Sequence, residues 1–269
     1  GGQPRGAFKK DWNNFQPRFG YAWKPFGAKR FVVRGGMGRS YLPTTDLGGN
    51  TGFSQTTNAE VSSVEGLAVR YLNNPFPSGL MQPPGTSRGL ATLAGDAISF
   101  NDPGRSVPYV WQYSTGIQLE PIRGVLVEAT YSGSQTRSLN VSKNINALSK
   151  EQLALGTLYL NQSQPNPFYG VLPTTTARGT YSTVQRRTLM LPYPQFGNIT
   201  KQMMSIGSAW YNGLQLRLDK RFKHGFSVLI TYTNSKTMQM TSFLNAQDEY
   251  LSRELASYDI PQRLVYSGI

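Results

Sequence analysis

Apolar and polar residues alternate with a period of two in three pairs of segments and in a further segment at the C-terminus. Because successive side chains of a β-strand point to opposite faces, such alternation over about ten residues predicts strands. The chain is therefore predicted to be all-β, with seven strands. The predicted strands are residues 13–24, 30–41, 108–120, 124–134, 207–219, 225–236 and 262–269.

Each predicted strand separates an aromatic face from a polar face. Tyr109, Trp111 and Tyr113 fall on one face of their segment, whereas Gln112 and Ser114 fall on the other. A face with Arg, Glu, Gln, Gly and Ser suits a wet lumen, and aromatics near segment ends suit the two interfaces of a bilayer. We expect the polar-face residues to face the lumen and to contact a plug or other parts of the barrel. They are Arg18, Gln112, Gln118, Glu128, Gln215 and Arg217.

The connections alternate between short and long. This is the pattern of an outer-membrane β-barrel, in which short turns face the periplasm and long loops face the outside. The sequence thus predicts a fragment of a large antiparallel transmembrane β-barrel with long extracellular loops. A soluble β-sandwich also alternates and is the competing interpretation. The predicted turns are Pro25–Lys29, Pro121–Arg123 and Lys220–Gly225, and the predicted loops are Leu42–Val107, Gln135–Ile206 and Thr237–Pro261.

Composition narrows the class of protein. No apolar stretch approaches the roughly 20 residues of a membrane helix, so a membrane span would have to be built from strands. The absence of cysteine excludes disulfides, a thiol nucleophile and thiolate metal ligands. The net charge of +13 is spread over the turns and loops without interleaved stacking residues, so we expect no nucleic-acid partner.

Candidate catalytic signals are weak. The single histidine, His224, lies in a predicted turn beside Lys223, where a solvent-facing role is expected. Gly35–Gly38 only superficially resembles a phosphate loop, and small residues in a strand more often allow close approach of a plug or a neighbouring backbone. We expect no catalytic, cofactor-binding or metal-binding residues, no cofactor and no enzyme activity. The ligand-binding residues stay undefined.

The long loops offer two further features. Ser149 followed by Gln152 predicts a capping box at the start of a short helix. The second loop is basic and the third is acidic, which would suit an anionic ligand or lipopolysaccharide phosphate and a calcium ion, respectively. Ordinary solvated charge also explains the charges of both loops, and it is the preferred interpretation.

Both ends of the chain suggest a piece of a longer protein. The N-terminus has neither an initiator Met nor an apolar signal-peptide core, and the last predicted strand runs to Ile269. We therefore expect residues 1–269 to form a partial barrel, without a plug or an N-terminal domain.

Eleven stretches, whose order and spacing span most of the chain, carry a family resemblance. They are Asn14–Ala22, Val33–Gly36, Pro108–Gln112, Val127–Ser134, Pro165–Gly170, Pro192–Gly197, Tyr211–Leu216, Lys220–Phe222, His224–Ser227, Tyr232–Lys236 and Tyr258–Arg263. In these stretches the chain resembles the Oar-like TonB-dependent outer-membrane receptors, which carry a carboxypeptidase-regulatory-like domain at the N-terminus.

The resemblance implies a large plugged barrel in the outer membrane of Gram-negative bacteria, of the 22-stranded transporter kind. Such a receptor captures an extracellular ligand at the cell surface and imports it with energy from the TonB-ExbB-ExbD system. Its other expected partners are outer-membrane lipid and lipopolysaccharide. Two alternatives stay open: a passive surface protein or adhesin that binds partners through its loops, and a soluble all-β carbohydrate-binding or hydrolytic module.

Overall fold

The computed structural model describes residues 11–27, 30–43, 56–57, 73–83, 85–87, 89–174, 176–223 and 225–269. The chain divides into two compact units. The barrel unit comprises Gly1–Asp46, Asn101–Lys143 and Lys201–Ile269, and the loop unit comprises Leu47–Phe100 and Asn144–Thr200.

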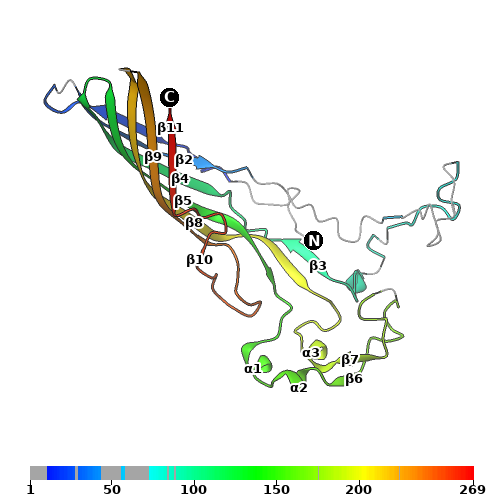
Figure 1. The fold of residues 1–269 in the computed structure, drawn as a ribbon. Helices are drawn as coiled ribbons and strands as arrows, with labels where there is room; N and C mark the ends of the chain where they lie inside the picture. Colours follow the sequence, from blue (N-terminus) through cyan, green and yellow to red (C-terminus); the bar gives the residue numbers. More distant parts are fainter. Residues whose placement is uncertain are drawn as a thin grey trace. The chain divides into compact units, whose positions relative to one another are not determined.

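The barrel unit is built from long neighbouring strands (Figure 1). The sheet has the order β1-β2-β4-β5-β8-β9-β10, and β11 also pairs with β9. The pairings β1–β2, β2–β4 and β4–β5, and those of β9 with β8, β10 and β11, are antiparallel. An all-β antiparallel sheet is therefore confirmed. The strands are β1 (Arg18–Trp23), β2 (Phe31–Tyr41), β4 (Tyr109–Ile122), β5 (Val125–Asn144), β8 (Ile199–Lys223), β9 (Phe226–Met240), β10 (Glu254–Leu255) and β11 (Gln262–Gly268).

Two strands run well into the segments predicted to be loops. β5 continues to Asn144 instead of ending at residue 134, and β8 begins at Ile199 instead of residue 207. Ser138 and Met203 both have a φ of 58°, in the left-handed region that interrupts a regular strand. The period of two is broken at these residues, which explains why alternation alone placed the end of β5 too early and the start of β8 too late.

The first strand is shorter than predicted. β1 begins at Arg18 rather than residue 13 because Pro17 has no N–H to add to the ladder. The Pro17 carbonyl still accepts a hydrogen bond from the Arg39 N–H at 3.0 Å.

Two hairpin turns share one geometry. Ile122 pairs with Val125, and Lys223 pairs with Phe226, each next to a register shift. Gly124 and Gly225 have φ of +88° and +86°, which glycine adopts without steric cost. The turns lie at the same end of the sheet, where the Arg221 N–H donates to the Gly124 carbonyl at 2.9 Å (Figure 1). Pro121 and Lys220 lie within strands, so both turns are tighter than predicted.

An apolar belt covers part of the outer face of these strands. Leu214 and Leu216 are 43% exposed, although both lie in the middle of a sheet. The belt ends at Asn212, whose Oδ1 accepts hydrogen bonds from the hydroxyls of Tyr113 at 3.2 Å and Tyr131 at 2.7 Å. Lys236 pairs with Asn212 in register, so this pair is polar, and Trp210 and Met238 form the next pair on this face.

β8 is far longer than the apolar belt requires. A tilted strand crosses a bilayer in about 9–11 residues, whereas β8 has 25 residues and β5 has 20. The half of β8 that precedes Asn212 therefore extends beyond the belt, on the side away from the short turns.

The loop unit contains regular structure of its own. It holds η2 (Gly89–Ala91), most of β3 (Ile98–Asn101), α1 (Lys150–Leu153), α2 (Thr157–Leu160), β6 (Ser163–Pro165), β7 (Thr183–Gln185) and α3 (Arg186–Leu189). β6 pairs with β7 in a small second sheet (Figure 1). In the described part of the chain, no helix is long and apolar enough to cross a membrane.

A buried asparagine side chain links two segments of the loop unit. Asn146 is 2% exposed; its amide donates to the carbonyls of Tyr193 at 2.9 Å and Gly197 at 2.8 Å, and its Oδ1 accepts from the Tyr193 N–H at 2.9 Å. The predicted capping box is confirmed, because Ser149 Oγ accepts from the Gln152 N–H and Gln152 Oε1 accepts from the Ser149 N–H. These side-chain bonds satisfy backbone groups that a loop would otherwise leave unpaired.

Candidate functional site

Strand register places the predicted polar residues on one face of the barrel unit. Arg18 pairs with Gly38, Gly38 with Gln112, and Gln112 with Ser134. Residues that pair directly across an antiparallel sheet share a face. All six residues predicted to face a lumen lie on this face, which we call the polar face. They fall into two regions.

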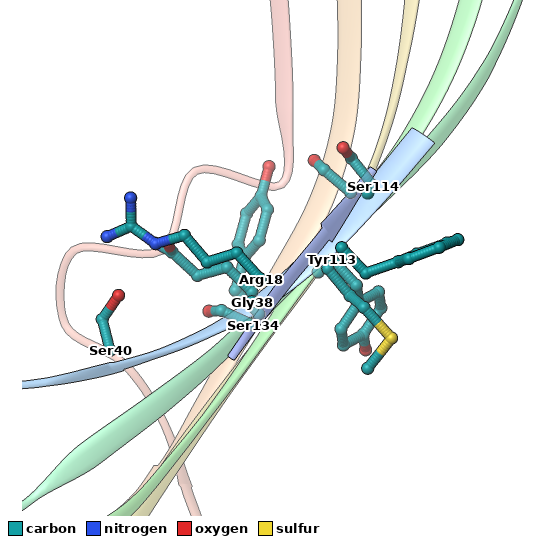
Figure 2. Close-up of a pocket in the computed structure, with 13 residues that line it drawn as sticks. Arg18, Gly38, Ser40, Tyr113, Ser114 and Ser134 are labelled. Carbon is teal, nitrogen blue, oxygen red and sulfur yellow. The ribbon is translucent and has the colours of Figure 1, made fainter. Parts of the chain in front are cut away.

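The first region is a shallow hollow of about 660 Å³ that includes Arg18 and Gln112. Arg18 and Ser40 project to one side of the sheet, whereas Tyr113 projects to the other (Figure 2). We call this region the hydroxyl hollow. Its polar-face lining residues are Arg18, Gly36, Gly38, Ser40, Gln112, Ser114, Ser132, Ser134 and Tyr211.

Glycines form the floor of the hydroxyl hollow. A Cβ added to Gly36 would lie 2.9 Å from the Phe19 carbonyl oxygen, and one added to Gly38 would lie 3.1 Å from Arg18 Cγ. The backbone of β1 therefore approaches β2 closely at Gly36, as the small residues of Gly35–Gly38 suggested. Because Gly38 carries no side chain, the Arg18 side chain can lie beside it.

The polar side chains of the hydroxyl hollow have few partners within the protein. Among the described residues, Arg18, Gln112 and Ser132 form no side-chain hydrogen bond or ion pair. These groups are consequently available to water, to another part of the protein or to a ligand.

The second region is a charged cluster around a cavity of about 300 Å³, which also contains Gln215 and Thr231. Arg34 forms an ion pair with Glu128 at 2.6 Å, and Arg217 forms one with Asp219 at 2.8 Å. Gln118 pairs in register with Glu128 beside this cluster.

Gly116 makes the ion pair between Arg34 and Glu128 possible, which reaches from β2 across β4 to β5. In register it lies between Arg34 of β2 and Thr130 of β5. A Cβ added to Gly116 would lie 2.6 Å from Thr130 Oγ1. Because Gly116 has no side chain, Arg34 can reach across β4 to Glu128, whose side chain is only 16% exposed.

Sequence reasoning did not single out Arg34 or Tyr211 as members of these regions. Counting by two from Gly36 and from Gly213 would have placed both on the polar face. Alternation cannot reveal that Arg34 pairs with Glu128, since the two residues are 94 positions apart.

No catalytic arrangement emerges from these regions. In the described ranges, no group of three or more His, Cys, Asp or Glu residues is placed to hold a metal ion. His224 lies outside the described residues. The absence of enzyme activity stays a prediction.

Comparisons with known proteins bear on the architecture. Residues 1–269 match the family described as "Outer membrane beta barrel domain". No curated protein matches the chain. Among solved structures, the chain is similar to the outer membrane transporter YddB from Escherichia coli, with 12% sequence identity and a TM-score of 0.44. The similarity covers 94% of this chain and 26% of that transporter, so the chain spans about a quarter of its length.

The family match explains both faces of the sheet. In an outer-membrane barrel the apolar belt faces lipid and the polar face lines the lumen. The free edges of the described sheet agree with a partial barrel, because lipid does not tolerate open edges. The protein is therefore located in the outer membrane. On the match over its whole length, the chain belongs to the outer membrane beta barrel domain family.

Proposed function

We propose that this chain is a section of a TonB-dependent receptor that captures an extracellular ligand and imports it across the outer membrane. The observation that carries the proposal is the hydroxyl hollow, where a wide polar wall faces the lumen with many side chains unpaired within the described sheet. A barrel filled by its own side chains would leave no such surface.

The strand dimensions also favour a large receptor. β5 and β8 continue well past the apolar belt and lead into the ordered loop unit. Loops of this length on a rigid scaffold commonly bind ligands. In the proposed mechanism, these loops capture the ligand, a plug rearranges, and the ligand passes along the polar face.

Energy for the plug rearrangement would come from the TonB-ExbB-ExbD system. The plug and the TonB-contacting segment would lie outside this chain, so no energy-coupling residue is assigned here. The charged cluster is the proposed contact region for the plug, because Arg34 is 54% exposed and its ion pair borders an open cavity.

The outer face offers a proposed contact with lipopolysaccharide. The Arg39 guanidinium stacks 3.9 Å from the centre of the Tyr109 ring and 4.6 Å from that of Tyr41. Arg137 pairs with Tyr109 from the other side. An arginine stacked on two tyrosine rings, with a second arginine paired in register with one of them, suits phosphate groups of the outer leaflet.

The import proposal can be tested by comparing cells that express the full-length receptor with cells that lack it and with cells that lack ExbB. Mass spectrometry would measure which compounds each strain removes from a complex medium. We expect the same compounds to remain unused in both deletion strains. A receptor deletion that abolishes surface attachment but changes no uptake would contradict import and support the adhesin alternative.

A further inference from the structure

A second hollow continues the hydroxyl hollow along the polar face. It has a volume of about 410 Å³, and Ser134 and Tyr211 line both hollows. Ser235 and Thr237 of β9 face it, and Tyr258 and Ile260 border it. Both volumes lie in the range of about 300–1,000 Å³ that is usual for ligand sites. Together the two hollows form one continuous track.

The Tyr211 side chain lies at the junction of the two hollows, with its phenol end over Gly213. A Cβ added to Gly213 would lie 2.3 Å from Tyr211 Oη and 2.8 Å from Cζ, so the ring covers Gly213. Tyr211 is correspondingly half-buried. The exposed part of this side chain lines both hollows.

The same packing occurs on the lipid-facing side of the sheet. Tyr21 covers Gly35 and Tyr113 covers Gly133, each within 2.8 Å of the position of an added Cβ. A tyrosine over a glycine is thus a general device for covering bare backbone in this sheet. Tyr211 differs from these two residues because its exposed ring face lies among hydroxyl groups rather than in the apolar belt.

We propose that the two hollows form a binding track for a neutral oligosaccharide. A sugar ring has an apolar C–H face bordered by hydroxyl groups, which matches an aromatic platform surrounded by small polar side chains. Tyr211 and the 67% exposed Tyr258 supply the platforms. Serine and threonine hydroxyls and the Gln112 amide supply donors and acceptors around them.

The few charged residues that line the track disfavour cationic and polyanionic ligands. In the part of the chain that the structure describes, no carboxylate lines either hollow, which disfavours a cationic ligand. Arg18 is the one cation that lines them within the described residues, which is too little for a polyanion. A purely apolar compound would leave the serine, threonine and Gln112 side chains of the lining without hydrogen-bond partners. Arg18 instead offers a planar set of N–H donors for hydroxyl oxygens.

This inference rests on the proposed function, since it names the class of compound that the receptor would import. The test uses the purified full-length receptor in detergent. Isothermal titration calorimetry would measure binding of a panel of neutral hexasaccharides built from glucose, mannose, galactose or xylose, with hexagalacturonate as the anionic comparison. We expect at least one neutral hexasaccharide to bind more tightly than hexagalacturonate.

Three variants locate the site. Tyr211→Ala should weaken binding roughly tenfold, because a stacking surface is lost. Ser134→Leu should abolish binding by blocking the junction of the two hollows. Tyr21→Ala is the matched control, because it removes the same tyrosine-over-glycine packing from the opposite face, and its affinity should equal that of the unmodified receptor. Migration on unheated gels verifies that each variant is folded.

The outcomes separate this inference from the import proposal. Failure of the whole neutral panel to bind, or full affinity in folded Tyr211→Ala and Ser134→Leu, overturns the oligosaccharide track. If ExbB-dependent uptake of another compound is found at the same time, the import proposal stands without the track. Saccharide binding in a receptor whose uptake is independent of ExbB supports the track and overturns the import proposal.

Discussion

The charged cluster and the hydroxyl hollow lie on the same face of the same strands, yet they treat polar groups in opposite ways. In the cluster, Arg34 and Glu128 satisfy each other, as do Arg217 and Asp219. In the hollow, Arg18 and Gln112 have no partner among the described residues. Glycine serves both regions, because Gly116 leaves room for the Arg34 side chain and Gly38 leaves room for that of Arg18.

The difference shows how one alternating pattern can serve two purposes. Pairing charges within the sheet fixes neighbouring strands, because a half-buried carboxylate left alone is costly. Leaving hydroxyls and an amide unpaired at a wet surface costs little, since water satisfies them until a ligand replaces it. The cluster thus stabilises the wall, and the hollow is free to bind.

The largest expected effect comes from filling the gap in the charged cluster. Gly116→Val places side-chain atoms within 2.6 Å of Thr130 Oγ1 and in the path of Arg34. We expect a loss of about 1–3 kcal/mol in the free energy of unfolding, as is usual for overpacking. Urea unfolding of the full-length protein in lipid vesicles would measure it. An unchanged unfolding midpoint would show that Arg34 does not need this space.

A smaller effect is expected from removing one charge of the cluster. Glu128→Gln should destabilise the protein by about 1 kcal/mol or less, because Arg34 is more than half exposed and solvent screens the pair. Ser132→Ala, on the same strand in the hollow, should be nearly neutral. A double-mutant cycle with Arg34→Met isolates the pair, and equal effects for Glu128→Gln and Ser132→Ala would erase the distinction between the two regions.

Another ion pair of the barrel unit should make the first residues of β8 sensitive to acid. Asp102 Oδ2 lies 3.0 Å from Lys201 Nζ, near the start of β8. Burial acts to raise the pKa of the Asp102 carboxyl, but the hydrogen bonds from Lys201 and the Gly104 N–H and the Lys201 charge together hold it below the usual 3.8.

The sign of the pH effect follows from that lowered pKa. The Asp102 contribution to stability is fully present above pH 3.8 and is lost as the pH falls through the lower pKa of the folded state. Hydrogen exchange at the amide of Asp102, which donates to the Gln202 carbonyl, should lose protection in this range. Asp102→Asn should reduce the protection already at neutral pH and remove this pH dependence, and an unchanged acid profile in Asp102→Asn would assign the effect to other groups.

The smallest effect is expected from a glycine of the hydroxyl hollow. The nearest atom to a Cβ added at Gly38 is Arg18 Cγ at 3.1 Å, in a flexible exposed side chain. Gly38→Ala should therefore change the free energy of unfolding by less than about 0.5 kcal/mol. The same urea experiment gives the comparison with Gly116→Val. A loss as large as that of Gly116→Val would mean that both regions are equally close-packed.

The sequence by itself determined which residues share a face, where most strands lie and where the chain turns. Gln112 and Gln215 could be assigned to the polar face because side-chain direction in a strand follows from local backbone geometry alone. Only the tertiary structure decided which polar groups are paired and which are free. Arg34 and Glu128 meet through the register of three strands, and Tyr211 covers Gly213 through its side-chain conformation, neither of which a period of two encodes. The strand ends were missed for a related reason, because the left-handed residues Ser138 and Met203 break the period while the ladder, held by neighbouring strands, continues.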